Sequence, residues 1–369
     1  MNKILKSNTI RSSYILFLIV LFTSCTQYQG EIKLVEEIEI PFQGKTRLIR
    51  PVNYNNSDCI CIEEVFQDSI NLRIYHLENG NELLTIKHPK PFNWFLSSGL
   101  KDHLLFSERN GSFILLNLDT ETTSYYMASD FGILNRDFFN LHSFSPDGTH
   151  LVADFKETKE NQALTMKNII SGCKLFSKES LLVELSLENE ALKFKDTIAY
   201  GFKEKYFFGK DGFGLSYTYI DRLDNDSYIL TSPYNDEIFF ITDDSEKSIK
   251  VKSKLRNIAV DVEPYSTYEK SSRKFNKNIS ENYANQPHIS SINYEKKTER
   301  IHLKIWNGEE KTMNLLTLNC DGKTLAESTI NMEHIKTNFY YQGKQYFIRK
   351  HNYEKDSHIN IDVYQYISD

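Results

Sequence analysis

Short runs in which apolar and polar residues alternate recur along the chain, and this spacing is typical of β-strands. Four segments share one pattern: an apolar strand, a polar tip with Asp or Glu beside Gly, Thr or Ser, and a second alternating strand. They are residues 72–86, 113–127, 238–252 and 314–328. Each of these segments predicts a β-hairpin.

The hairpins recur at a spacing that is typical of a β-propeller. Leu77 of the first hairpin aligns with Leu118 of the second, a step close to the ~40–45 residues of a four-stranded blade. The segment FSPDGTHLVADF (144–155) places Pro146, Asp147 and Gly148 in a tight turn between two strands. This turn resembles the FSPDG turn of TolB-like and WD40-like propellers.

Grouping the strands predicts an all-β fold, a β-propeller of six blades. The candidate blades lie near residues 59–87, 92–127, 140–190, 198–252, 288–331 and 337–367. The region 155–215 is hard to divide into strands, so seven blades is the alternative count. The two end segments, 31–40 and 359–367, also alternate as strands do. We expect them to pair within one blade, because this pairing closes the ring and leaves no open sheet edge.

One segment, near residues 264–283, breaks the strand pattern. It begins with Pro264, and its aromatic and apolar residues fall at helical spacing. We expect an amphipathic helix inserted between blades and lying over one face of the ring. Either its aromatic stripe packs against the propeller, or the helix is a lid or a partner-binding element.

The N-terminus has the order of a secretory signal: basic residues, an apolar run over residues 14–22, two small residues and then Cys25. The run is shorter than the ~20 residues that cross a bilayer. A cysteine in this position resembles the lipobox of bacterial lipoproteins, although Phe22 stands where leucine is typical. The resemblance implies that a signal peptide, residues 1–24, is removed and that Cys25 carries acyl chains such as palmitate. The alternative is a secreted protein in which Cys25 is incidental.

Lipidation would attach the protein to a membrane without crossing it. Residues 25–30 would then be the lipidated cysteine and a short tether, and residues 31–369 a single propeller domain. Surface-exported lipoproteins resemble one another in an acidic cluster after the cysteine, and this cluster is missing here. We therefore expect the outer membrane, facing the periplasm, with the outside surface as the alternative.

The net charge limits which partners the protein is expected to bind, and the cysteine content bears on whether disulfides form. The formal net charge is -6, and removing the signal removes only positive charges, which argues against nucleic acid as a partner. Four cysteines remain after Cys25, namely Cys59, Cys61, Cys173 and Cys320. Cys59 and Cys61 would point to the same face of one strand and cannot readily bond each other. Free buried thiols are favoured over long-range disulfides, and both states stay open.

Two stretches and the signal together resemble a known family. These are FGLSYTYIDRLDNDSYILTSPYNDEIFFI (213–241) and HISSINYEKKTERIHLKIW (288–306). The mature chain resembles a family of uncharacterised Gram-negative bacterial lipoproteins, a domain of unknown function with a TolB-like propeller fold of six or seven blades. Glu295 stands where the family has aspartate, and Ile301-His302 where it has a Tyr-Tyr pair. The resemblance implies a fold and an envelope location but no activity.

No catalytic motif accompanies this pattern. The sequence has no H-E-x-x-H, no paired C-x-x-C and no G-x-S-x-G, so we predict no cofactor and no metal site, and the catalytic residues of any enzyme activity stay unknown. The weak candidates for an ion site are Asp221, Asp224 and Asp226, hard oxygens of the kind that calcium prefers. They lack the glycine and the distal glutamate of an EF-hand loop, and a solvated hairpin tip is the favoured interpretation.

These observations favour a lipid-anchored, monomeric, non-enzymatic propeller that binds a protein, a peptide or a glycan. The alternative is a hydrolase or lyase whose site lies in the central channel, and a third hypothesis is a structural component of an envelope complex. Clustered ionisable groups in the channel would favour the enzyme, whereas an exposed aromatic patch would favour the binding protein.

Overall fold

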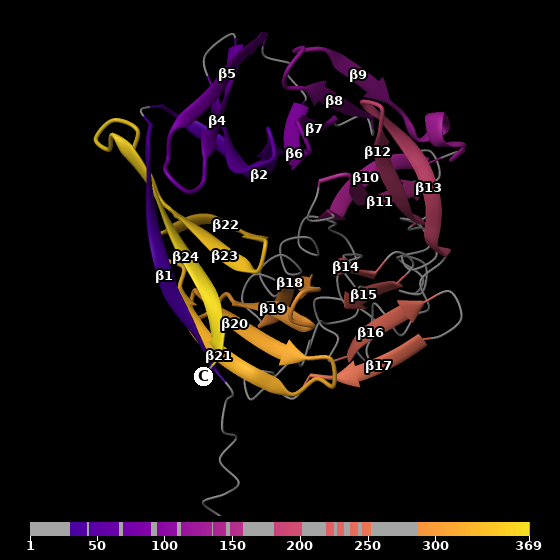
Figure 1. Ribbon diagram of the computed structural model, residues 1–369, viewed down its shortest axis with the longest axis vertical. Helices are drawn as coiled ribbons and strands as arrows, with labels where there is room; N and C mark the ends of the chain where they lie inside the picture. The colour runs from indigo at the N-terminus through magenta and orange to yellow at the C-terminus, as the bar shows by residue number, and fades with distance from the viewer. Residues whose placement is uncertain are drawn as a thin grey trace, which may run out of the picture.

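Six four-stranded antiparallel sheets form a ring in the computed structural model (Figure 1). The structure describes residues 30–42, 44–65, 69–89, 94–108, 112–134, 136–144, 148–157, 181–200, 219–224, 227–231, 237–242, 246–251 and 287–368. The prediction of an all-β propeller with six blades is confirmed.

The first three blades follow one another along the chain. Blade 1 consists of β2 (Thr46–Tyr54), β3 (Ser57–Val65), β4 (Ser69–His76) and β5 (Glu82–Pro89). Blade 2 consists of β6 (Trp94–Leu100), β7 (His103–Glu108), β8 (Phe113–Asn117) and β9 (Thr123–Tyr126), and the short 3-10 helix η1 (Ala128–Phe131) follows it. Blade 3 consists of β10 (Arg136–Phe144), β11 (His150–Glu157), β12 (Leu181–Glu188) and β13 (Ala191–Tyr200).

The last three blades include the ring closure. Blade 4 consists of β14 (Tyr219–Asp224), β15 (Ser227–Thr231), β16 (Glu237–Thr242) and β17 (Glu246–Lys250). Blade 5 consists of β18 (His288–Glu295), β19 (Arg300–Asn307), β20 (Thr312–Asn319) and β21 (Thr324–Asn331). Blade 6 consists of β22 (Ile335–Tyr341), β23 (Lys344–Arg349), β24 (His358–Ser368) and, from the other end of the chain, β1 (Gly30–Pro41).

The first strand of blades 1 to 5, and β22 of blade 6, lies nearest the centre of the ring (Figure 1). β1 is the outermost strand of blade 6 and pairs with β24 from Gly30↔Ser368 to Pro41↔His358. The prediction that the two ends of the chain share one blade is therefore confirmed.

The four predicted hairpins are the two outer strands of blades 1, 2, 4 and 5. Glycines at positive φ, Gly80 at 68° and Gly322 at 78°, belong to two of their turns, a conformation that glycine adopts without steric cost. The predicted start of blade 1 at residue 59 is wrong, because β2 (Thr46–Tyr54) precedes it. The region 155–215 contributes strands only to blade 3 among the described residues.

The core lies between the blades. In β3, Cys59 and Cys61 pack with residues of blade 2, whereas Ile60 and Ile62 pack with residues of blade 6. Both faces of the sheet are therefore buried, which is why the central strands read as continuous apolar runs. Cys59, Cys61 and Cys320 are free thiols, and burial raises the pKa of Cys59 to about 11.

Several predicted features lie outside the described residues. They are the signal peptide 1–24, Cys25, the Pro146-Asp147 turn, Cys173, Asp226 and the helix near 264–283. In the part of the chain that the structure describes, no helix is both long and apolar enough to cross a membrane.

We expect the closing strand to be a main source of stability. Ile40 of β1 is fully buried in the core between blades 6 and 1, so Ile40→Ala should lower the free energy of unfolding by about 2–5 kcal/mol. Its neighbour Glu39 is exposed, and Glu39→Ala should change it by less than about 0.5 kcal/mol. Urea denaturation measures both, and equal effects of the two substitutions would contradict the closure.

Candidate functional site

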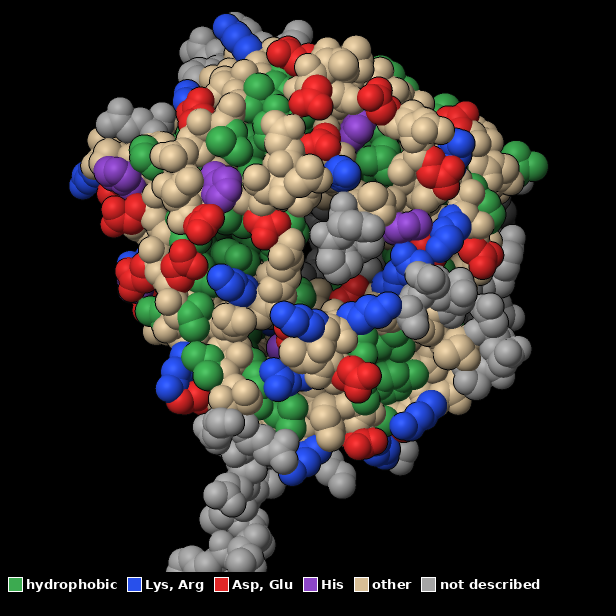
Figure 2. All heavy atoms as spheres, viewed as in Figure 1, with side chains coloured by type: hydrophobic (Ala, Val, Ile, Leu, Met, Phe, Trp, Pro, Cys, Tyr) green, Lys and Arg blue, Asp and Glu red, His purple; other side chains and the backbone are tan. Residues whose placement is uncertain are grey.

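Large apolar side chains are exposed at the perimeter of the ring, around η1. Figure 2 shows hydrophobic side chains projecting at the right edge of the face, where Figure 1 places η1. The hydroxyl of Tyr126 accepts a hydrogen bond from Leu192 N at 3.0 Å, which ties β9 of blade 2 to β13 of blade 3 at this place. We call the exposed residues on this side the η1 patch: Met127, Leu134 and Phe194, whose exposed fractions lie between 44% and 73%.

The η1 patch rests on a stack of aromatic rings. The rings of Phe113, Tyr126 and Phe131 lie in pairs with centroids 5.5–5.7 Å apart and nearly parallel planes. Phe131 also contacts Phe155 of blade 3 at 6.4 Å. These rings fix the backbone that carries the exposed side chains, so the patch is held in one arrangement.

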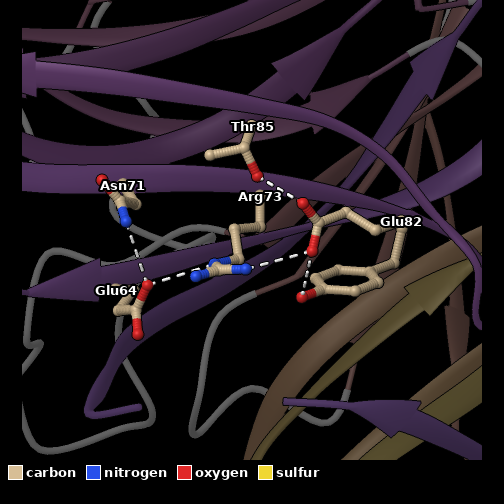
Figure 3. A network of polar contacts seen from close by, with 6 residues as sticks. Glu64, Asn71, Arg73, Glu82 and Thr85 are labelled. Atoms are coloured by element: carbon tan, nitrogen blue, oxygen red, sulfur yellow. Dashed lines mark hydrogen bonds and ion pairs between the residues drawn. The ribbon is translucent and has the colours of Figure 1, made fainter. Parts of the chain in front are cut away.

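The buried charged groups of the propeller mainly form hydrogen bonds and ion pairs that join strands within a blade or join neighbouring blades. In blade 1, Arg73 donates to Glu64 Oε2 and to Glu82 Oε2, both at 3.1 Å (Figure 3). Asn71 donates to Glu64 at 3.2 Å, and Thr85 donates to Glu82 at 2.6 Å. The network joins β3, β4 and β5, and its carboxylates are occupied by donors.

A second network joins blades 3 and 4 around Glu184, which is 2% exposed. Its carboxylate lies 3.0 Å from Lys195 Nζ, 3.1 Å from His150 Nδ1 and 3.3 Å from Arg222 Nη1. The hydroxyl of Tyr228 in blade 4 also donates to it, and burial together with this bond raises the pKa of Tyr228. Residues of both blades compensate the negative charge of this carboxylate, so the carboxylate links blade 3 to blade 4.

A partly buried ion pair also joins the two inner strands of blade 1, β2 and β3. Arg47 Nη1 donates to Glu63 Oε1 at 3.1 Å, and both Arg47 and Arg50 belong to the inner strand β2. Burial raises the pKa of Glu63, while Arg47 and Arg50 oppose that shift. This carboxylate is therefore also matched by cations.

The structure describes two of the three predicted ion-site candidates, Asp221 and Asp224. Asp221 is buried and accepts hydrogen bonds from Arg222 N at 2.8 Å and from Tyr294 N of blade 5 at 2.7 Å. It joins two blades and is not a solvated tip residue. Asp224 lies at the end of β14 opposite Ser227. Within the described ranges, no group of three or more His, Cys, Asp or Glu is arranged to hold a metal ion.

One inter-blade site differs from these networks because its polar groups are only partly matched. Along β19, Ile301, Leu303 and Ile305 pack toward blade 4, so the alternate residues His302 and Lys304 point toward blade 6. We call the site the Lys304 cluster. It contains Ser291, Asn293, His302, Lys304 and Thr317 of blade 5 with Asn338, Tyr340 and Gln345 of blade 6.

Lys304 is the central charge of this cluster. It is 6% exposed, and its Nζ donates to Asn338 Oδ1 at 2.7 Å. Among the described residues no carboxylate pairs with it, and burial lowers the pKa of Lys304 to about 8. In the part of the chain that the structure describes, this cation therefore has a hydrogen-bond partner but no counter-ion.

His302 is fixed beside this lysine. Its Nδ1 lies 3.1 Å from the hydroxyl of Thr317, its Nε2 lies 3.4 Å from Glu295 Oε2, and its ring lies 5.3 Å from the ring of Tyr340. The hydrogen bond with His302 lowers the pKa of Glu295, and burial opposes that shift. The Glu295 carboxylate therefore pairs with His302 and does not compensate the positive charge of Lys304.

Four buried oxygens of the Lys304 cluster have no hydrogen-bond partner among the described residues: Ser291 Oγ, Asn293 Oδ1, Tyr340 Oη and Gln345 Oε1. Each such atom costs about 1–3 kcal/mol when it stays unpaired. A small hollow lined in part by His302, Thr317 and Gln345 runs between the two blades. Of the four residues with unpaired oxygens, only Gln345 lines this hollow.

Sequence reasoning noted His302 and Glu295 only as departures from a family pattern and did not identify Lys304. The available signal is the alternation in RIHLKIWN (300–307), where a lysine interrupts an apolar strand whose two faces are both buried. Its partner Asn338 belongs to the next blade, so sequence alone does not join the two.

Comparison with known proteins shows the fold. No protein-family model matches the chain, and no curated protein matches its sequence. A crystal structure of a member of the DUF4221 family from Bacteroides vulgatus is similar, with 13% identity, a TM-score of 0.57, and coverage of 92% of this chain and 100% of that one. The six-bladed ring fits a propeller domain of unknown function.

Two solved enzyme structures match at lower TM-scores. An oligogalacturonate lyase in complex with manganese matches at a TM-score of 0.44 and 11% identity, covering 89% of this chain and 82% of that one. A structure from a study of two prolyl endopeptidases matches at a TM-score of 0.42 and 8% identity, covering 86% of this chain and 42% of that one. These likenesses concern the fold alone.

We expect Lys304 to reduce the stability of the fold below pH 8. Its pKa is about 8 in the folded protein and near the ordinary ~10.4 in the unfolded chain, so the unfolded state binds more protons between these values. The cost of the buried charge is full at pH 7 and disappears as pH rises from 8 to 10.5. Lys304→Met should therefore raise the free energy of unfolding at pH 7, by about 3 kcal/mol.

Urea denaturation of wild type and variant at pH 7 and pH 10 measures this gain, which should shrink at the higher pH. Lys350→Met, at an exposed lysine, is the matched control and should change stability little at either pH. A Lys304→Met gain of the same size at both pH values would show that the charge is not its cause.

Proposed function

We propose that the protein is a non-enzymatic binding propeller of the bacterial envelope that receives a protein or peptide partner on its η1 patch. The observation that carries this proposal is the exposure of Met127 and Leu134 on either side of η1 and of Phe194 on β13, the strand that is tied to Tyr126 through Leu192. Soluble monomers rarely expose such groups together, and aromatic residues and Met are enriched at the centres of interfaces.

The surroundings of the patch favour a partner of a particular composition. Asp130 of η1 is exposed and lies between Met127 and Leu134 in the chain. A carboxylate beside apolar side chains suits a segment that carries apolar anchors and a Lys or Arg. The aromatic stack beneath the patch limits the ordering cost of binding. A protein or peptide is thus preferred to a glycan as the partner.

The ionisable groups argue for binding over catalysis. A hydrolase or lyase needs a carboxylate or histidine that is free to move a proton, whereas Glu63, Glu184 and Glu295 are each held by a cation or by His302. A channel-centred enzyme is therefore the weaker alternative.

The location rests on the N-terminal sequence. Cys25 follows the order of a lipoprotein signal, and acyl chains on its sulfur and amino group would hold the propeller beside a membrane. The absence of an acidic cluster after Cys25 supports the periplasmic face of the outer membrane. The anchor would limit the partners to those that reach the same surface.

A photo-crosslinking residue at Met127 tests the patch. In the native envelope we expect the Met127 variant to form one discrete adduct on irradiation, and the adduct should be lost when Leu134→Asp is added, because a buried carboxylate opposes the contact. Tyr353, which is also exposed but belongs to the loop between β23 and β24, is the matched control position. Adducts at both positions, or at neither, would contradict a partner on the η1 patch.

Substitution at Cys25 tests the anchor. Wild type should incorporate labelled palmitate and sediment with membranes, and Cys25→Ser should do neither. Cys320→Ser, at a half-buried thiol of the propeller, should behave as wild type does. Labelling and sedimentation of Cys25→Ser at the wild-type level would refute the anchor.

A further inference from the structure

Gly30, at the start of β1, fixes the point where the chain enters the propeller. It is buried and pairs with Ser368 at the end of β24, and a side chain here would come too close to the carbonyl oxygen of Ile367 and the hydroxyl of Tyr366. Cys25 lies only five residues before Gly30. A fully extended chain covers at most about 3.3–3.6 Å per residue, so Cys25 stays within about 18 Å of this end of β1.

The inference that follows rests on the acyl anchor proposed at Cys25. With the acyl chains in a bilayer, so short a tether keeps the Gly30 end of β1 close to the lipid headgroups. Figure 1 shows the C-terminus, which neighbours Gly30, at the lower end of the β1–β24 pair, and it shows β13 and η1 at the opposite edge of the ring. Blade 6 is therefore the part of the propeller that the anchor brings nearest to the membrane.

Three large apolar side chains are exposed at this end of the β1–β24 pair. Leu34 and Val35 of β1 are 43% and 40% exposed, and Ile367 of β24 is 40% exposed; we call them the β1 edge. Ile367 lies opposite Glu31, and Glu31 is three residues from Leu34, so Ile367 and Leu34 lie on opposite faces of the sheet. A flat surface that meets the blade edge-on reaches both faces, whereas a partner packed on one face does not.

A β-bulge accounts for the exposure of two successive apolar residues. The register of β1 against β24 shifts between Leu34 and Glu36, so Val35 has no opposite residue on β24. Bulges in edge strands interrupt the ladder that a further strand would need for pairing. The bulge therefore disfavours strand pairing with a second copy of the chain and favours a surface that has no strand of its own, such as a bilayer.

The carboxylates beside the β1 edge are partly neutralised. Two that flank Leu34 and Val35 along β1 form ion pairs: Glu31 with Lys33 and Glu36 with Lys344. The next carboxylate, Glu37, shares Arg349 with Asp362. An anionic lipid surface repels unpaired carboxylates, and these ion pairs reduce that repulsion where the apolar side chains are exposed.

We propose that the β1 edge is the surface on which the propeller rests against the membrane, with Leu34, Val35 and Ile367 at the boundary between lipid headgroups and acyl chains. Peripheral proteins bind at this boundary by burying apolar side chains in it. The ring then stands on blade 6, and the η1 patch, at the opposite edge in Figure 1, faces away from the membrane. A partner on the η1 patch is reached from the side away from the lipid.

Photo-crosslinking to lipid tests this orientation. The acylated protein is placed in vesicles of phosphatidylethanolamine with a minor share of phosphatidylglycerol, and a photo-reactive residue at Val35 should yield protein that carries the added mass of one phospholipid. Leu83 is the matched control position, because it is 44% exposed and also lies at a bulge in the outermost strand of a blade. It belongs to β5 of blade 1, far from Gly30 in Figure 1, and should yield no lipid adduct.

Substitution separates a binding contact from mere closeness to the anchor. Leu34→Asp together with Val35→Asp should lower the lipid adduct of a photo-reactive residue at Ile367 at least about tenfold, since each methylene buried in lipid changes partitioning roughly fourfold. Leu83→Asp should leave that adduct unchanged. Leu34, Val35 and Leu83 are all exposed, so these variants should stay folded.

The intact mass of the same protein shows whether Cys25 is acylated, so the anchor and the β1 edge are tested separately. Protein without acyl chains would refute both. Acylated protein that gives no lipid adduct at Val35, equal adducts at Val35 and Leu83, or a cross-link to a second copy would overturn the β1 edge alone. An adduct at Ile367 that persists in the double Asp variant would overturn it as well.

Discussion

Every blade of this propeller has two apolar faces, and the rest of the structure depends on covering both. Ile60 and Ile62 of β3 pack toward blade 6, while Cys59 and Cys61 of the same strand pack toward blade 2. A row of such sheets would leave its two end faces bare, whereas a ring covers all of them. The ring is closed by β1 and β24, the two ends of the domain, which pair along eleven positions of β1.

Closure also determines where charge can lie. Groups between blades lose water on both sides, so they must be matched within the interface. Glu184 is matched from blades 3 and 4, and Asp221 accepts a backbone hydrogen bond from blade 5. Lys304 departs from this rule, because no carboxylate among the described residues pairs with it and its Nζ donates to Asn338. The η1 patch is the converse case, because its large apolar side chains lie on the outside of the ring and are exposed.

The sequence predicts the outer part of each blade better than the inner part. The outer hairpins are local, with tight tips and strict alternation, so 72–86 and 314–328 were identified without knowledge of the ring. The inner strand β2 (Thr46–Tyr54) was missed because it is half-buried and mixes arginines and a proline with apolar residues. Such a strand is explained by its place nearest the centre of the ring, and this centre exists only when all blades are assembled.

The same distinction explains the sites. Asp221 looked like a tip residue because its neighbours are polar, and only the contact with Tyr294, far away in the sequence, shows it to be buried. Lys304 meets Asn338 across a blade boundary. Pairings between blades are long-range contacts, which neither periodicity nor motif spacing encodes.

Hydrogen–deuterium exchange of the backbone amides tests the closed ring most directly. The account predicts that the paired amides of β1 and β24 are protected together and as strongly as those of β3 and β20, since all of them open only when the ring opens. Rapid exchange throughout β1, with protection retained in β20, would contradict it, because β1 would then be a loosely attached edge and the ring would not depend on it.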